Sequence, residues 1–200
     1  MTSFIFVGLG NPGDEYKDTR HNTGRIVLEY FRKSREFPEW EFDKMLNAQV
    51  SRGKLKKKSV ILVLPDTFMN KSGETVKKLI KSKAQAESLA VIHDELDIAS
   101  GRVKMSFNKS SGGHRGVESI MKAVKTEAFT RVRVGISPAN AKGVLKKPQG
   151  EEEVGDFILG KFKPSEMSDI KKISKKVADS LEIFALDGRD KATGICNTEK

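Results

Sequence analysis

Five polar residues could perform acid–base or hydrogen-bonding chemistry. Each of them follows an apolar stretch of the sequence or lies in the loop after one. They are Asn11, His21, Asn70, Asp94 and His114. A histidine beside a carboxylate is the usual general base, because the carboxylate fixes the tautomer of the imidazole and stabilises the imidazolium ion. His21 and Asp94 form the best such pair. Each residue alone is more simply a turn former or a satisfied polar group, so only the whole set indicates a site.

The sequence offers no evident protein nucleophile for this site. No serine lies in a G-x-S-x-G elbow, and the single cysteine, Cys196, lies in a polar stretch near the C-terminus. The simplest reaction is therefore attack on an acyl carbon by a water molecule that the histidine activates. Asparagine amides would hold the carbonyl group and the water.

A metal site is an alternative use of the acidic stretch around Asp94. His93, Asp94, Glu95 and Asp97 could bind a hard cation. However, no H-E-x-x-H motif or other regular ligand spacing supports such a site. We therefore expect a hydrogen-bonded loop here, with no metal ion.

A dinucleotide site is a second alternative, and it would make the chain an oxidoreductase. Gly8, Gly10 and Gly13 match the G-x-G-x-x-G fingerprint. Pro12 lies inside this motif, and residues 14–18 (DEYKD) lack helical apolar spacing. The sequence therefore lacks the helix N-terminus that would hold a pyrophosphate, and we expect no cofactor.

Strand and helix patterns alternate along the chain. We expect strands at residues 4–7, 45–52, 59–64, 89–92, 101–107 and 129–136, and helices at residues 22–35, 74–83, 117–125 and 164–186. Residues 36–43 and 138–150 are predicted to be connections, and residues 154–162 are apolar but interrupted by glycines. This order predicts one α/β domain over residues 1–200, with a central mixed, twisted sheet and helices on both faces. Loops at one edge of that sheet would gather the polar residues.

The composition points to a soluble protein with a polyanionic partner. The chain has 37 basic and 27 acidic residues, a net charge of +10. Solubility alone could explain this excess, but the lysines are clustered at residues 54–58, 77–83, 142–147 and 171–176. Such clusters bind phosphates without reading a base sequence. A lone cysteine excludes an internal disulfide, and no apolar run is long enough to span a bilayer. No cleavable leader is evident either, so we expect a cytoplasmic protein.

Taken together, these residues resemble the bacterial type of peptidyl-tRNA hydrolase. The matching stretches occur in the order found in the family: VGLGNPGDEYKDTRHNTG at Val7–Gly24, PDTFMNKSG at Pro65–Gly73, HDELDI at His93–Ile98, GGHRG at Gly112–Gly116, RVRVGI at Arg131–Ile136 and GDFILGKF at Gly155–Phe162. The resemblance implies the fold of that family and a monomeric hydrolase without a cofactor. Its substrate would be the ester between a peptide and the 3′ end of tRNA.

The resemblance also implies roles for individual residues. His21 would activate water and Asp94 would orient His21. Asn11 and Asn70 would hold the peptide end of the substrate and the attacking water. The remaining substrate-binding positions are Tyr16 and Met69, which would line the groove, His114 and Arg115 in the GGHRG stretch, and Arg133 and Lys142, which would clamp the 5′ phosphate of the tRNA.

Two positions depart from the family pattern. Arg115 stands where the family usually has an asparagine of the substrate groove, and arginine is larger and can only donate hydrogen bonds. Ser106 stands near a phosphate-binding lysine of the family, for which Lys104 or Lys109 could substitute. Arg115 motivates a second hypothesis, a non-catalytic RNA-binding relative that keeps the fold and the basic face.

Overall fold

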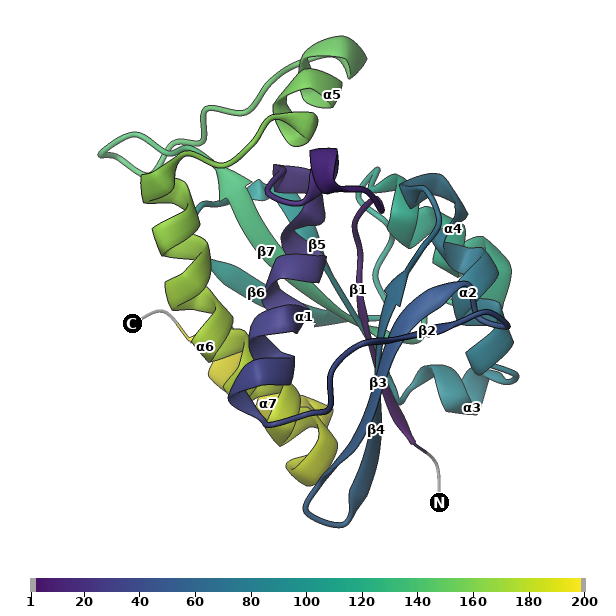
Figure 1. Ribbon diagram of the computed structural model, residues 1–200. Helices are drawn as coiled ribbons and strands as arrows, with labels where there is room; N and C mark the ends of the chain where they lie inside the picture. The colour runs from purple at the N-terminus through teal and green to yellow at the C-terminus, as the bar shows by residue number, and fades with distance from the viewer. Residues whose placement is uncertain (1–2, 199–200) are drawn as a thin grey trace.

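The computed structural model describes residues 3–198 and is organised around a seven-stranded sheet with the order β2-β3-β4-β1-β5-β7-β6 (Figure 1). The strands are β1 (Phe4–Gly8), β2 (Glu41–Asp43), β3 (Ala48–Leu55), β4 (Lys58–Pro65), β5 (Leu89–Ala99), β6 (Val103–Phe107) and β7 (Thr130–Ser137). The central strands β4, β1, β5 and β7 are parallel, and β2, β3 and β6 join them in antiparallel pairs at the two sides. The prediction of a mixed sheet is confirmed.

The two central strands are apolar because both of their faces are covered. Phe6 and Val7 in β1 are wholly buried, as are Ala90 and Val91 in β5. Phe6 and Ala90 belong to one core cluster and Val7 and Val91 to the other. Strands buried on both faces are expected to show continuous apolar runs rather than alternation.

Helices cover both faces of the sheet. On one face lie α1 (Thr23–Ser34), α6 (Pro164–Asp187) and α7 (Arg189–Asn197), whose core includes Phe31 and Phe184. On the other face lie α2 (Ser72–Leu79), the short α3 (Lys83–Ala86) and α4 (Arg115–Val124). Helix α5 (Glu151–Leu159) buries none of its residues and lies beyond the upper end of the sheet in Figure 1. Among the described residues, no helix has both the length and the apolar composition needed to cross a membrane.

Several elements differ from the sequence-based prediction, among them helix α5, where only an interrupted apolar stretch was expected. Strand β5 continues through the expected loop at His93–Asp97, because these residues keep pairing with β7 as far as Glu95. The expected connection at residues 36–43 ends in the short strand β2. The expected polar tail around Cys196 is helix α7, in which the thiol is buried.

Helix α7 also covers the outer side of strand β6. The side-chain amide of Asn197 accepts a hydrogen bond from the backbone N–H of Met105 at 2.7 Å and donates one to its carbonyl at 3.0 Å. Arg189 stacks over the ring of Phe107, with its guanidinium carbon 3.5 Å from the ring centroid. The last residues of α7 therefore pair with an edge strand as a neighbouring strand would.

The glycines of the fingerprint stretch allow neighbouring segments of the backbone to pack closely. A Cβ atom on Gly8 would lie 2.5 Å from the carbonyl oxygen of Gly24, and one on Gly24 would lie 2.2 Å from the carbonyl oxygen of Ile92. Strand β1, the start of α1 and strand β5 therefore approach one another through glycine. Gly13, with φ at +108°, is followed by the single 3-10 turn η1 (Asp14–Tyr16) rather than by the helix that a dinucleotide site requires.

Candidate active site

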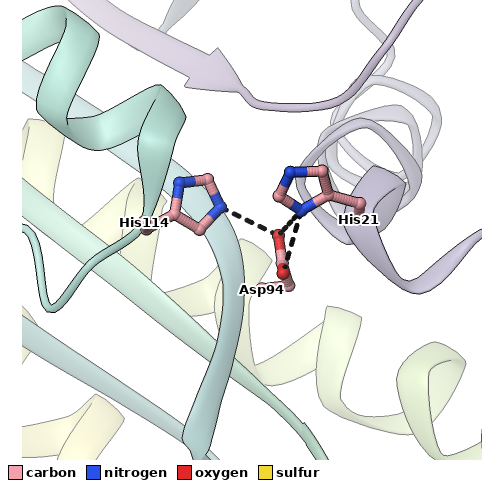
Figure 2. Close-up of side chains that lie close together, drawn as sticks. All are labelled: His21, Asp94 and His114. Atoms are coloured by element: carbon pink, nitrogen blue, oxygen red, sulfur yellow. Dashed lines mark hydrogen bonds and ion pairs between the residues drawn. The ribbon is translucent and has the colours of Figure 1, made fainter. Parts of the chain in front are cut away.

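His21, Asp94 and His114 form a cluster at the carboxyl ends of the central strands, in which His21 and Asp94 are buried and His114 is half-buried (Figure 2). His21 lies in the 3-10 turn η2 (Arg20–Asn22), Asp94 in β5, and His114 at the N-cap of α4. The Nδ1 atom of His21 lies 3.1 Å from each carboxylate oxygen of Asp94, and the Nε2 atom of His114 lies 3.0 Å from Oδ1. Three segments that are distant in sequence thus meet at one carboxylate.

The charge of Asp94 determines where the proton of His21 lies. Burial acts to raise the pKa of Asp94, but the attraction of His21 and His114 and their hydrogen bonds outweigh it and hold the pKa well below its ordinary value. An ionised carboxylate only accepts hydrogen bonds, so Nδ1 of His21 carries the proton. Its Nε2 atom then has a free lone pair, and Figure 2 shows this nitrogen pointing away from Asp94. That is the arrangement of a general base.

The backbone of helix α4 fixes the tautomer of His114. Its Nδ1 atom accepts hydrogen bonds from the backbone N–H groups of Gly116 and Val117 at 3.2 and 3.3 Å. The proton of a neutral ring must then lie on Nε2, which donates it to Asp94. His114 is therefore both the cap of α4 and the second donor to the carboxylate.

A metal ion would compete with this hydrogen-bond arrangement. The ligand atoms of His21, Asp94 and His114 lie within 4.8 Å of one another, a spacing that a cation could bridge. However, Nε2 of His114 cannot offer a lone pair while its Nδ1 caps α4. Only His21 and Asp94 would remain as protein ligands, fewer than a typical zinc site provides.

Asn11 is held so that its amide nitrogen is available. Its Oδ1 atom accepts the backbone N–H of Met69 at 2.8 Å, so the carbonyl end of the amide is occupied. The side chain of Asn22 accepts from the backbone N–H of Asn11 at 2.8 Å and donates to its carbonyl at 2.9 Å. The Nδ2 group of Asn11 has no partner among the described residues and can donate to a substrate.

The turn that carries His21 is anchored by the residue before it. Arg20 donates two hydrogen bonds to the carboxylate of Glu166 at 3.0 and 2.8 Å and one to the carbonyl of Phe157 at 3.2 Å. Its guanidinium carbon also lies 4.5 Å from the ring centroid of Phe157. Arg20 thus connects η2 to α5 and to the start of α6.

The other residues expected in the peptide groove lie near this cluster in different settings. Asn70 is exposed in the 3-10 turn η3 (Met69–Lys71), next to the residue that holds Asn11. The side chain of Met69 is only 5% exposed and packs in the core below α4, so its backbone N–H is its contribution to the site. Tyr16 is half-buried at the end of η1.

Arg115 pairs with a residue outside the histidine cluster. It is the first residue of α4, and its guanidinium forms an ion pair with Glu151, the first residue of α5. Both side chains are largely exposed. Arg115 therefore connects the first residues of two helices, and the contacts of Asp94 with His21 and His114 are present beside it.

The two expected phosphate ligands lie on the β7 side of the site. The Nε atom of Arg133 donates to Glu95 at 2.8 Å, one residue after Asp94, and a quarter of its side chain is exposed. Lys142 is exposed in the connection between β7 and α5 and has no ion pair among the described residues. The lysine cluster at residues 54–58 lies in the β3–β4 turn, at the opposite end of the sheet (Figure 1).

The partners that position the site residues were not predicted from the sequence. Asn11 is positioned by Asn22, and the turn that carries His21 is anchored by the pair of Arg20 with Glu166. Glu95 pairs with Arg133, and Glu151 pairs with Arg115. Asn22 stands beside His21 in the same polar stretch, which was a usable signal. The other contacts join segments more than 30 residues apart and have no local sequence signature.

Comparison with known proteins gives the same assignment over nearly the whole chain. The family model described as Peptidyl-tRNA hydrolase matches residues 5–200. The peptidyl-tRNA hydrolase of Bdellovibrio bacteriovorus is 36% identical over 197 residues, which are 98% of this chain and 100% of that protein. That of Aquifex aeolicus is 36% identical over 196 residues, covering 98% of this chain and 96% of that protein. The crystal structure of peptidyl-tRNA hydrolase from Acinetobacter baumannii gives a TM-score of 0.88 at 28% identity, covering 100% of this chain and 96% of that one.

Proposed function

The chain belongs to the peptidyl-tRNA hydrolase family, and on this premise we propose that it cleaves the ester between a peptide and the 3′ end of tRNA with His21 as the general base. The observation that carries this assignment is the geometry of the His21–Asp94 pair. Nδ1 of His21 is held by an ionised carboxylate, and Nε2 is free to accept a proton.

The reaction begins when Nε2 of His21 removes a proton from a water molecule. The water oxygen attacks the ester carbonyl carbon and forms a tetrahedral intermediate, while Asp94 stabilises the imidazolium ion. The Nδ2 group of Asn11 donates to the oxygen of the reacting carbonyl, where negative charge develops. The bond from carbon to the ribose oxygen then breaks, and His21 returns the proton to that oxygen. The products are free tRNA and a peptide with a terminal carboxylate.

The tRNA is proposed to lie on the β7 side of the site. Arg133 and Lys142 are the expected ligands of the 5′ phosphate, and Lys104 and Lys109 are exposed on β6 and in the loop after it. Their charges suit a phosphate backbone, which supplies most of the affinity of such complexes. We further propose that the protein acts as a monomer in the cytoplasm, where translation takes place.

The hypothesis of a non-catalytic relative rested on Arg115 alone. Arg115 pairs with Glu151, while the contacts of His21, Asp94 and His114 are complete. Nothing in the site therefore favours this alternative over hydrolysis.

The proposed base is tested by replacing it. We expect His21→Ala to hydrolyse N-acetyl-aminoacyl-tRNA about 10²–10⁴ times more slowly than the wild type, the usual contribution of a general base. Loss of the ester is followed by acid precipitation of the labelled substrate. Lys54→Ala, at the far end of the sheet, is the control and should keep the wild-type rate. A His21→Ala variant as fast as the control would contradict the mechanism.

A further inference from the structure

A groove of about 600 Å³ runs between helices α2 and α4, on the side of the site opposite Arg133 and Lys142. Its mouth is formed by Asn70 and Arg115, which adjoin Met69 and His114 of the site described above. Further along, the lining residues are Lys71, Gly73, Glu74 and Lys77 from the α2 side, and Glu118, Ser119, Lys122 and Ala123 from α4.

The floor of the groove is a close contact between the two helices. The backbone N–H of Gly73 donates to Oγ of Ser119 at 3.0 Å, and a Cβ atom on Gly73 would lie 2.2 Å from the carbonyl oxygen of Ser119. Both helices begin at the end of the sheet that carries the site. The groove therefore leads outward from the site between two rigid walls.

The charges along this groove are mainly positive. It is lined by four basic residues and two acidic ones. Lys122 is paired with Glu118 at 2.7 Å, and Arg115 is paired with Glu151. Lys71 and Lys77 are exposed and have no carboxylate partner within the part of the chain that the structure describes. Glu74 also lines the groove and has no ion pair among the described residues, so the charges left unpaired in the groove are two positive and one negative.

The order of the strands decides which part of the substrate reaches the groove. The reacting ester lies above β1 and β5, and the proposed tRNA ligand Arg133 lies on β7, on one side of them. Helix α2 follows β4, which adjoins β1 on the other side. A substrate whose tRNA lies toward β7 therefore directs its peptide toward α2.

We propose that this groove holds the peptide part of the substrate and that Lys71 and Lys77 favour peptides with acidic side chains there. The inference rests on the proposed hydrolysis of peptidyl-tRNA. Lys77 lies about 8 Å along the helix axis from Ser72, at about 1.5 Å per residue. An extended peptide covers that distance with two or three residues at about 3.3 Å each. A single blocked amino acid is too short to reach Lys77.

The test compares pentapeptidyl-tRNAs that carry either two glutamates or two glutamines upstream of the esterified residue. The measured quantity is the ratio of kcat/KM for the glutamate substrate to kcat/KM for the glutamine substrate. We expect this ratio to be about 3 to 10 in the wild type, since each exposed charge pair contributes only modestly to binding. The double variant Lys71→Glu and Lys77→Glu should bring the ratio below one.

The matched control is the double variant Lys54→Glu and Lys57→Glu in the β3–β4 turn, which changes the net charge equally and should keep the wild-type ratio. If the lysines of the groove bound tRNA instead, their variant would slow both substrates by the same factor, and this unchanged ratio would overturn the proposal. A wild-type ratio of one would overturn it as well. Hydrolysis of N-acetyl-aminoacyl-tRNA by the wild type separates these results from failure of the hydrolase function, which would overturn both proposals.

Discussion

At the scale of single residues, the proton positions in the site are fixed by ordinary hydrogen-bond rules. Two backbone amides set the tautomer of His114, and two histidines keep Asp94 ionised. Asp94 in turn holds the proton of His21 on Nδ1. The free lone pair of His21 is thus a consequence of how helix α4 begins.

This dual role of His114 separates stability from activity in two variants. Asparagine is also a good N-cap, so we expect His114→Asn to keep the cap and to lose only the contribution of the hydrogen bond to Asp94, about 1.5–3 kcal/mol of the free energy of unfolding. It lacks the donor that reaches Asp94, and we expect its hydrolysis rate to fall about tenfold, the effect of losing roughly one hydrogen bond to a charged group. His114→Ala should lose about 1 kcal/mol more stability. Urea unfolding measures the stability of both variants, and steady-state kinetics measures their activity. Equal activity in the wild type and in His114→Asn would refute the role of Nε2 of His114.

His93 makes the folded protein sensitive to acid. Burial, together with repulsion from His114 and Arg131, holds the pKa of His93 well below 6.5. Below pH 6.5 the unfolded chain therefore binds a proton that the folded chain refuses, and stability falls as the pH falls. We expect His93→Gln to remove this contribution, so that the wild type loses up to about 1.4 kcal/mol more per pH unit than the variant.

The measurement is urea unfolding of both proteins at several pH values between 5 and 8. Comparing the two slopes cancels the contribution of the other groups that titrate in both proteins. Parallel slopes would show that the titration of His93 is not coupled to folding.

At the scale of elements, glycine contacts set how closely the helices approach. We expect Gly73→Ala to destabilise the protein by about 1–3 kcal/mol, because its Cβ atom would overlap the α4 backbone. Gly194 in α7 is the control, since nothing lies within 4 Å of a Cβ atom there. Gly194→Ala should be stabilising by up to about 1 kcal/mol, from helix propensity alone. The two thermal unfolding midpoints should therefore move in opposite directions.

The elements predicted correctly from sequence are those with the strongest apolar patterns. Strand β1 and the first part of β5 are buried on both faces and show continuous apolar runs, and helix α1 shows an apolar face at helical spacing. Helix α7 was missed because it buries only Ala192 and Cys196, and β2 because it is three residues long. The extension of β5 was missed because its polar residues are satisfied by tertiary partners that the sequence does not reveal.

Some contacts of the candidate site were predicted from the sequence and others were not. The pairing of His21 with Asp94 was predicted, because a histidine and a carboxylate each follow a buried strand. The partners of Arg115 and Arg133 were not, because Glu151 and Glu95 are brought near only by the packing of α5 and the register of β5 against β7.

At the scale of the whole molecule, the positive charge should make tRNA binding depend strongly on salt. Lys142 is exposed and free of ion pairs among the described residues, so its charge is available to a phosphate. We expect Lys142→Ala to weaken binding and to lower the slope of log K against log salt by about one. Lys54→Ala at the distant turn should leave the slope unchanged. Filter binding of acceptor-stem RNA over a salt series measures both, and identical slopes for Lys142→Ala and wild type would exclude a phosphate contact.

The side chain of Asn197 affects whether two copies of the chain can associate through the edge of the sheet. Strand β6 is the last strand of the sheet, and an uncovered outer edge of this kind is a template on which another chain can add a strand. Because the Asn197 amide occupies both backbone groups of Met105, an incoming strand finds that part of the edge already paired. Helix α7 thereby closes that part of the edge to strand addition by another copy of the chain.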